Sequence, residues 1–378
     1  MTILTHGCRS NLAERDALAA LAGPSRTVIN SCAVTASAVR DARAAAKAAT
    51  GDIVITGCAA TYAPERFADL PVTLIPNYQK LNPESWGRTG RSVPAVTRQS
   101  RGFVAIQDGC DHACTFCVTT LARGASRSIP VAEVLQSVQE LADAGINEVV
   151  LTGIDTTSYG LDLPGKPTLG ALVQSLLAKT PKLPRLRLSS LDAAEADDAL
   201  LEAFTETRLM PHIHLSLQSG DDLILKRMRR RHSRADAVCL VARLKSARPD
   251  IAIGADLIAG FPTEGEAAHR NSLALLADCA IVHAHVFPFS SRPGTAAARM
   301  PQVSAGIAKQ RAAELRAAAT LRKNAFLQSH LNTAVETVSE GAQGYTPTYA
   351  GIRYLTPQPK GALIRVTPHR LADGFLHA

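Results

Sequence analysis

Residues 1–95 alternate between two patterns of apolar and polar positions, and the alternation predicts a small parallel α/β domain. The expected strands are short apolar runs, at residues 2–5, 26–30, 52–56 and 72–75. The expected helices have apolar residues at helical spacing, at about 11–21, 36–48 and 61–68. Strands that alternate with helices in this order form a parallel sheet.

A second, longer strand–helix repeat begins at Gly102, after a segment rich in Pro, Gly and polar residues (76–100) that is typical of a linker. The expected strands are at 102–107, 148–153, 185–190, 212–217, 251–260 and 282–289, with helices between them such as 131–144 and 266–278. Repeated βα units predict an open, partial (β/α)6 barrel. In such barrels the chemistry lies at the C-terminal ends of the strands.

The end of the chain changes character. A basic helix is expected at 304–329, leaving the barrel, and β-branched residues, Gly and Pro then predict a small all-β tail. The fold class is therefore α/β, divided into an N-terminal parallel α/β domain (1–95), a partial barrel (101–300), a linking helix (301–330) and an all-β domain (331–378).

Composition adds constraints on location and partners. No run of 18 apolar residues and no signal peptide are visible, so we expect a cytoplasmic protein without a membrane partner. The net charge is +8, and residues 301–378 hold nine Lys and Arg against four Asp and Glu. Residues 226–234 hold six more basic residues. Each basic run alone fits a solvated surface, but two such regions in one chain favour RNA, because basic patches bind phosphates.

Cys110, Cys114 and Cys117 form a Cys-x-x-x-Cys-x-x-Cys run directly after the first barrel strand. Three thiolates for a four-iron cube leave one iron without a protein ligand, and that iron can bind a small molecule. A zinc site completed by His112 is the main alternative. A disulfide framework would need an oxidising compartment.

Three more cysteines, Cys8, Cys32 and Cys58, each follow one of the first three predicted strands. The carboxyl ends of parallel strands share one edge of the sheet, so these thiols should converge on a second three-cysteine site. Three independent buried thiols, or a zinc site completed by His6, are the alternatives. Cys239 and Cys279 lie in helical patterns and are expected in the core.

An ordered set of motifs resembles the radical S-adenosylmethionine (SAM) methylthiotransferases over nearly the whole chain. The motifs are THGCRSNLAE, VINSCAVTASAVRDAR, ITGCAA, GCDHACTFC with RGASRS, LTGIDTTSYG, RLRLSSLD, HIHLSLQSGDDLILKRM, ADLIAGFPTEGE and VFPFSSRPGTAAARM. The tail resembles a shortened TRAM domain, a small β-barrel that binds RNA. Glu14 in GCRSNLAE, RLRLSSLD and the Arg-Pro-Gly-Thr stretch at Arg292–Thr295 are similar to the branch that modifies threonylcarbamoyladenosine.

The resemblance implies two 4Fe–4S clusters, one on each cysteine set, and SAM as cofactor. The implied enzyme is a transferase that inserts sulfur at C2 of N6-threonylcarbamoyladenosine, at position 37 in the anticodon loop of tRNA, and methylates it. Its partners would be tRNA, a reducing electron donor of flavodoxin or ferredoxin type, and a sulfur source. Isopentenyladenosine tRNA or a ribosomal-protein aspartate are alternative substrates within the family. A non-catalytic iron–sulfur RNA-binding protein is an alternative of another class, whereas a cobalamin enzyme is disfavoured because the N-terminal domain has no Asp-x-His-x-x-Gly stretch.

Residues around the SAM cluster are assigned by type and place. Phe116 is expected to pack on adenine, or in the core. Gly153 lets the backbone approach the cofactor, or is a turn glycine. The remaining candidates are polar: Ser189, Ser190 and Gln218 for the ribose or carboxylate of SAM, Asp155 for ribose or substrate or as a helix cap, and Arg123 and Arg127 for a substrate carboxylate or phosphate or as surface ion pairs.

Overall fold

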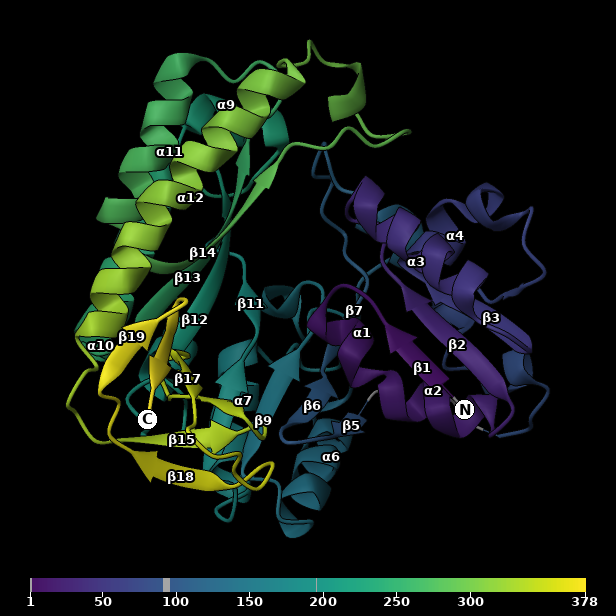
Figure 1. Cartoon of the computed structure of the whole chain (residues 1–378), viewed down its shortest axis with the longest axis horizontal. Helices are drawn as coiled ribbons and strands as arrows, with labels where there is room; N and C mark the ends of the chain where they lie inside the picture. The colour runs from purple at the N-terminus through teal and green to yellow at the C-terminus, as the bar shows by residue number, and fades with distance from the viewer. Residues whose placement is uncertain (1, 91–95, 195) are drawn as a thin grey trace.

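The computed structural model describes residues 2–90, 96–194 and 196–378. Its N-terminal part contains the predicted parallel sheet (Figure 1). The strands are neighbours in chain order, all parallel: β1 (Thr2–Thr5), β2 (Arg26–Ser31), β3 (Asp52–Gly57) and β4 (Thr73–Leu74). Buried Val28, Ile29, Val54 and Ile55 supply the middle of the sheet, as their apolar runs predict.

The helices of this part differ from the predicted ones at two places. The observed helices are α1 (Arg9–Ala13), α2 (Arg15–Ala22), α3 (Ala36–Ala48) and α4 (Cys58–Tyr62). The predicted helix at 11–21 is therefore two helices that meet at Glu14. The predicted helix at 61–68 is wrong: α4 begins at Cys58 and ends before Pro64, which starts a separate 3-10 turn, Pro64–Phe67. Proline has no N–H for the helical ladder.

The segment predicted as a linker (76–100) is largely part of the N-terminal fold. It forms two 3-10 turns, Asn77–Gln79 and Pro83–Trp86. Trp86 is buried against Leu18 and Leu21 of α2, and its indole N–H donates to the carbonyl of Lys80 (2.8 Å). The linker prediction failed because polar and turn-forming residues dominate its composition, while one aromatic residue anchors it. Residues 91–95 lie outside the described part.

The central part is the predicted open barrel of parallel strands. Its main strands are β6 (Gly102–Ala105), β9 (Glu148–Thr152), β10 (Arg185–Leu188), β12 (His212–Gln218), β13 (Ala252–Ala259) and β14 (Ile281–Pro288). They form two parallel sheets, β10-β9-β6 and β12-β13-β14, to which the short β11 (Ser190–Leu191) and the antiparallel β5 (Val96–Arg98) add edges. A bridge between Leu186 and Leu209 joins the first sheet to the segment before β12.

The barrel is covered on its outside by helices, and the main apolar core lies between the two layers. These helices are α6 (Val131–Asp143), α7 (Leu169–Lys179), α8 (Asp198–Ala203), α9 (Asp222–Met228), α10 (Arg234–Ala247) and α11 (Glu266–Asp278). Cys279, directly after α11, is buried as predicted, but Cys239 on α10 is exposed, so the core prediction is wrong for that residue.

Helix α12 (Ala305–Gln328) was expected to leave the barrel, but it packs along it beside β14 and α11 (Figure 1). Its buried Ala312 and Leu315 belong to the main core. Arg311 also points inward and bonds to Glu264 (3.0 Å). The helix therefore covers the barrel before it connects to the tail. No helix in the described part of the chain is long and apolar enough to cross a membrane.

The tail folds into a sheet, as predicted, whose strand order is β18-β15-β16-β17-β20-β19. The strands are β15 (Val335–Ser339), β16 (Gln343–Tyr345), β17 (Gly351–Arg353), β18 (Leu363–Val366), β19 (Arg370–Ala372) and β20 (Phe375–His377). All neighbouring pairs are antiparallel except β17 with β20. Its assignment as a TRAM domain stays a prediction.

Ion pairs from buried arginines tie the tail to the N-terminal ends of the barrel strands. Glu148, at the start of β9, is fully buried and accepts two bonds from Arg187 (2.9 and 3.1 Å). Arg101 and Arg185 flank the same carboxylate, and each also pairs with a glutamate of the tail, Glu340 for Arg101 (2.7 Å) and Glu336 for Arg185 (2.9 Å). One barrel glutamate and two tail glutamates thus balance the charges of the three buried arginines, so the balance requires the docked tail.

Tyr349 of the tail connects all three parts of the chain. Its ring stacks on His212 at the start of β12 (centroids 4.8 Å apart), and its hydroxyl accepts a bond from Arg9 of α1 (3.0 Å). The guanidinium of Arg187 lies over the same ring (5.0 Å). The tail therefore reaches into the barrel rather than extending from it.

Candidate functional site

The loop of the first cysteine set runs from β7 (Gln107–Asp108) to α5 (Thr119–Arg123) and is closed at its base. There β7 pairs antiparallel with β8 (Arg127–Ser128). The N–H of Cys110 donates to the carbonyl of Gly124 (3.1 Å). Gly109 has φ +74°, and a Cβ on it would lie 1.9 Å from the carbonyl oxygen of Ala125. Only glycine fits this position, which turns the chain into the loop.

N–H groups point at all three sulfurs of this set. The backbone N–H of His112 approaches Cys110 Sγ (3.4 Å), and that of Thr119 approaches Cys117 Sγ (3.3 Å). The guanidinium of Arg230 approaches Cys114 Sγ (3.5 Å). Burial raises the pKa of Cys110 to about 12, and Asp155 adds to the rise. Metal binding must therefore displace protons, and the N–H groups then stabilise thiolate ligands.

The spacing of the thiols bears on the zinc alternatives. One tetrahedral zinc ion with bonds of about 2.3 Å would hold its sulfurs about 3.8 Å apart. Among the described residues, the groups with three ligand atoms within 4.8 Å of one another are Cys110–His112–Asp155 and His214–Asp256–His285. Neither cysteine triplet closes to that spacing. A cluster that binds each sulfur to a different iron accommodates wider spacing, so the three sulfurs of each set fit a cluster better than one zinc ion, which the first set could hold only through Cys110, His112 and Asp155.

Asp155, predicted to contact ribose or substrate, lies beside the first cysteine set. Its carboxylate accepts bonds from Ser158 Oγ (2.6 Å) and Thr157 Oγ1 (3.0 Å), and the His112 ring is 3.0 Å away. It precedes a 3-10 turn, Thr156–Ser158, without accepting a capping bond from its backbone. Asp155 therefore orients His112 next to Cys110, which is 3.9 Å from the carboxylate.

Three predicted SAM contacts lie at the ends of barrel strands. Ser189, between β10 and β11, is buried, and its hydroxyl has no partner among the described residues, which suits a bound ligand. Ser190 follows it and accepts a bond from Thr156 through its carbonyl (2.7 Å). Gln218 ends β12 in the left-handed region (φ +67°), an uncommon conformation for a residue with a side chain.

The other two predicted contacts have clear packing roles. A Cβ on Gly153 would lie 2.9 Å from the methyl group of Thr156, so close packing already calls for glycine there. Phe116 meets Phe261 edge to face, with centroids 6.2 Å apart, beside buried Met228. Phe116 therefore packs on other apolar side chains, and its contact with adenine stays a prediction.

The second cysteine set lies at the carboxyl edge of the N-terminal sheet. Cys8 precedes α1, Cys32 follows β2, and Cys58 is the first residue of α4 directly after β3. Cys32 packs against Gly7, where a Cβ would lie 2.7 Å from its sulfur. Burial raises the pKa of Cys32 to about 11, and the nearby thiols of Cys8 and Cys58 raise it further. The three strand ends thus bring the thiols into mutual electrostatic range.

Arg123 lies in this second set and not at the surface. Its side chain is 1% exposed. Its guanidinium donates to Cys58 Sγ (3.2 Å), Asn11 Oδ1 (2.5 Å) and Asp108 Oδ1 (2.6 Å). The prediction that it binds a substrate carboxylate or phosphate is therefore wrong, because every face of the group is occupied. Arg127 is exposed and pairs with Asp108 (3.3 Å), as its ion-pair alternative proposed.

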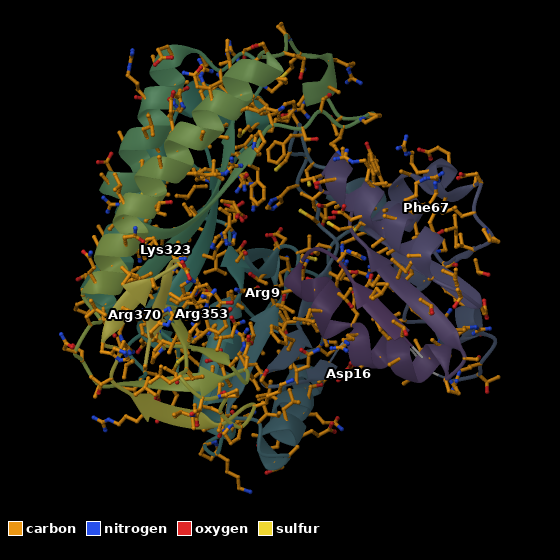
Figure 2. The ribbon with its side chains drawn as sticks, viewed as in Figure 1. Arg9, Asp16, Phe67, Lys323, Arg353 and Arg370 are labelled. Atoms are coloured by element: carbon orange, nitrogen blue, oxygen red, sulfur yellow. The ribbon has the colours of Figure 1, made fainter. Side chains whose placement is uncertain are left out.

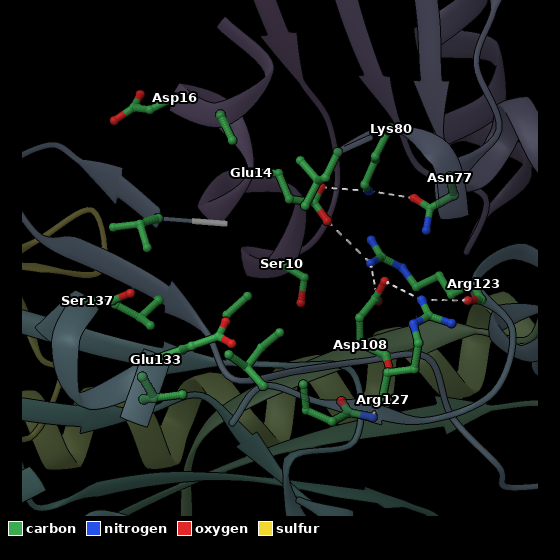
Figure 3. Close-up of a pocket in the computed structure, with 18 of the residues that line it drawn as sticks. Ser10, Glu14, Asp16, Asn77, Lys80, Asp108, Arg123, Arg127, Glu133 and Ser137 are labelled. Carbon is green, nitrogen blue, oxygen red and sulfur yellow. Dashed lines mark hydrogen bonds and ion pairs between the residues drawn. The ribbon is translucent and has the colours of Figure 1, made fainter. Parts of the chain in front are cut away.

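A buried charge network extends from Arg123 into the N-terminal fold (Figure 3). Glu14, which marked the branch in the sequence, pairs with Lys80 (2.6 Å) and lies 3.6 Å from Arg123. Lys80 is 1% exposed and also donates to Asn77 (2.5 Å). The network borders a cavity of about 750 Å³ between the two domains, which Arg127 also lines. Sequence reasoning missed Lys80 because it lies in the segment predicted as a linker.

Arg230 is a second site residue that the sequence did not identify. Besides Cys114, it bonds to Asp192 (2.7 Å), directly after β11, and to the carbonyl of Ser216 (2.7 Å) in β12, so it joins the cysteine loop to the barrel. It belongs to the basic run 226–234, which was interpreted as an RNA-binding surface. The left-handed conformation of Arg229 (φ +57°) ends α9 and turns the chain, which separates Arg230 from its exposed neighbours.

Two histidines beside Asp256, the buried His214 and the exposed His285, form a third polar group in the barrel. His214 and His285 both contact Asp256 Oδ1, at 2.9 and 3.2 Å. They lie on the adjacent strands β12, β13 and β14. Histidines at alternate positions, 212 and 214 and again 283 and 285, were the signal in the sequence, because alternate residues of a strand face the same side.

Comparisons with known proteins agree with this architecture. Residues 104–276 match the family model of the Radical SAM superfamily. The solved structure of the radical SAM methyltransferase TsrM from Kitasatospora setae superposes with a TM-score of 0.53 at 14% identity, over 75% of this chain and 68% of that one. At this identity the likeness concerns the fold alone.

Relatives are similar over almost the whole chain. The threonylcarbamoyladenosine tRNA methylthiotransferase MtaB of Rickettsia prowazekii is 41% identical over 367 residues, which are 89% of this chain and 87% of the relative. MtaB of Bacillus subtilis is 31% identical over 415 residues, 96% of this chain and 92% of the relative. The chain therefore belongs to the threonylcarbamoyladenosine tRNA methylthiotransferase family within the radical SAM superfamily.

Proposed function

We propose that the chain is a transferase that inserts sulfur at C2 of N6-threonylcarbamoyladenosine, at position 37 of tRNA, and methylates it. One observation carries the proposal beyond family membership: the two cysteine sets adjoin. Helix α5 begins two residues after Cys117 and ends at Arg123, which contacts Cys58 of the other set. A reaction that needs both radical generation and a sulfur carrier requires two such centres close together.

Membership of the radical SAM superfamily implies one 4Fe–4S cluster and SAM. Cys110, Cys114 and Cys117 would hold that cluster, and its remaining iron would bind SAM. When bound, the cluster supplies the electron that cleaves SAM. The hydroxyl of Ser189, which has no partner in the described part of the chain, would bind SAM, and Arg230 would hold Cys114 against the barrel. Cys8, Cys32 and Cys58 would hold the second cluster, which carries the sulfur that is transferred.

The tRNA partner is supported by basic side chains, of which Arg353 and Arg370 are exposed and Lys323 is half-buried. Lys323 is on α12, and Arg353 and Arg370 are on β17 and β19 of the tail (Figure 2). Arg229 and Arg231 line a pocket of about 320 Å³ beside His112 of the first cysteine loop. Phosphates would bind at the tail surface, and the unpaired base would be read near the cysteine loop, since unpaired bases are splayed out for recognition. A reducing protein and a sulfur source complete the proposed partners.

The two-cluster part of the proposal is tested by iron content and SAM cleavage. Anaerobically reconstituted protein should bind about eight irons. The Cys110→Ala/Cys114→Ala/Cys117→Ala variant should keep about half and lose SAM cleavage. The corresponding variant of Cys8, Cys32 and Cys58 should cleave SAM but transfer no sulfur. Four irons in the wild type, zinc instead of iron, or equal loss of SAM cleavage in both variants would contradict the assignment.

The substrate is tested by offering the purified enzyme threonylcarbamoyladenosine tRNA, isopentenyladenosine tRNA and the ribosomal protein. Mass spectrometry of the digested products should find the methylthio group on the first substrate. Product on either of the others with none on the first would exclude this substrate while leaving the chemistry intact. Nucleoside analysis of tRNA from a deletion strain gives the same comparison in the cell.

A further inference from the structure

Arg123 joins the two cysteine sets through a short helix. Arg123 is the last residue of α5, and the N–H of the first residue of that helix, Thr119, approaches Cys117 Sγ. The carbonyl of the next residue, Gly124, accepts the N–H of Cys110. Both ends of the first cysteine loop are therefore fixed to the five-residue helix that carries Arg123. Any displacement of that loop moves the Arg123 side chain relative to the N-terminal sheet.

The guanidinium makes directed contacts with the second set. Its Nε donates to Cys58 Sγ at 3.2 Å, and its Nη2 lies 3.9 Å from Cys8 Sγ. The planar group fixes these directions, because its five N–H donors form a rigid fork. The remaining donors bond to Asn11 (2.5 Å) and Asp108 (2.6 Å), so the fork is held from the opposite side.

The charged side chains around Arg123 nearly balance one another without any metal. Arg123 and Lys80 are the buried cations, and Glu14 and Asp108 are their carboxylate partners. A four-iron cluster with three thiolate ligands would add negative charge here, and one more when reduced. A fixed cation in hydrogen-bond contact with a ligand sulfur stabilises the reduced form more than the oxidised form.

We propose that Arg123 is a positioning residue that raises the reduction potential of the second cluster and holds Cys58 in register with the first cysteine loop. The inference rests on the proposed second cluster and names the residue of this chain that controls its reduction potential. The Arg123 side chain is 1% exposed, and its bonds go to Cys58, Asn11 and Asp108.

The test uses the full chain with Cys110, Cys114 and Cys117 replaced by Ala, so that only the second cluster is observed. Iron content and the midpoint potential, followed by electron paramagnetic resonance, are measured for this parent and for three further variants. Arg123→Gln should shift the potential to more negative values, because the cation is lost. Asp108→Asn should shift it to more positive values, because Arg123 is less compensated. Arg127→Gln, an equal charge change on the exposed neighbour, should leave it unchanged.

The outcomes separate this inference from the two-cluster proposal. A parent without iron overturns both. If the parent binds iron and Arg123→Gln has the same midpoint potential as the parent, only the role of Arg123 is overturned. If Arg123→Gln does not retain a cluster, Asp108→Asn decides, and an unchanged or more negative potential there refutes the inference. A shift in Arg127→Gln as large as that in Arg123→Gln also refutes it, because the effect would then not depend on contact with Cys58.

Discussion

Replacing Glu148 by Gln exchanges only one carboxylate oxygen for an NH₂ group, but it should destabilise the barrel strongly. Glu148 is 0% exposed and is the shared partner of Arg187, Arg101 and Arg185. The amide would point an N–H₂ group at one of the two donors of Arg187 and would remove the charge that compensates the buried arginines. Losing one member of a buried ion pair costs about 3–5 kcal/mol.

For a folding unit of the size of the barrel, this corresponds to a drop of roughly 6–20 °C in the midpoint of thermal unfolding. The measurement is calorimetry or circular dichroism on the anaerobically reconstituted protein. Glu336→Gln is the matched control, because Glu336 also pairs with Arg185 but is 53% exposed. Its loss should cost about 0–1 kcal/mol. A Glu148→Gln variant as stable as this control would show that carbonyls, such as those of Thr346 and Pro347, already satisfy the arginines.

The pH dependence gives an independent check. Burial alone would raise the pKa of Glu148, but Arg187, with Arg101 and Arg185, outweighs it and lowers the pKa below 4.5. The folded state therefore binds fewer protons at this group than the unfolded state. Its contribution to stability is present above pH 4.5 and is lost as the pH falls through the folded pKa. The difference between wild type and Glu148→Gln should accordingly shrink in acid.

Three further predictions concern the tail and the cysteine loop. Deleting residues 331–378 should lower thermal stability and SAM cleavage as well as tRNA binding, because the buried arginines at the base of the barrel lose their glutamate partners in the tail. Unaltered SAM cleavage would contradict the docking described above. Replacing Lys323, Arg353 and Arg370 together by Ala should weaken tRNA binding and reduce the slope of log affinity against log salt by about 3, with SAM cleavage unchanged; an unchanged slope in filter binding would exclude this surface. Gly109→Ala should lose about half of the bound iron, because its Cβ would clash with the carbonyl of Ala125, and full iron content would show that the loop can rearrange.

The local patterns of the chain determined much of the architecture. Apolar runs placed the strands of both parallel sheets, because a buried strand needs apolar residues wherever it is in the fold. The strand-end positions of Cys8, Cys32 and Cys58 indicated one shared edge, since parallel topology leaves no other arrangement. The spacing of Cys110, Cys114 and Cys117 likewise suited a single loop. The family followed from motifs in order, and the relatives confirmed it.

Tertiary structure decided which charged residues are buried, and no local pattern contains that information. Arg123 and Arg230 come from stretches that look like basic surface, yet each contacts a cysteine sulfur. Lys80 comes from a polar stretch but is enclosed beside Glu14. A buried charge is tolerated only when a partner distant in sequence is brought to it, here Asp108, Asp192 and Glu14. The sequence by itself therefore determined which cysteines form the two neighbouring sets, and only the folded chain determined the charges that surround and connect them.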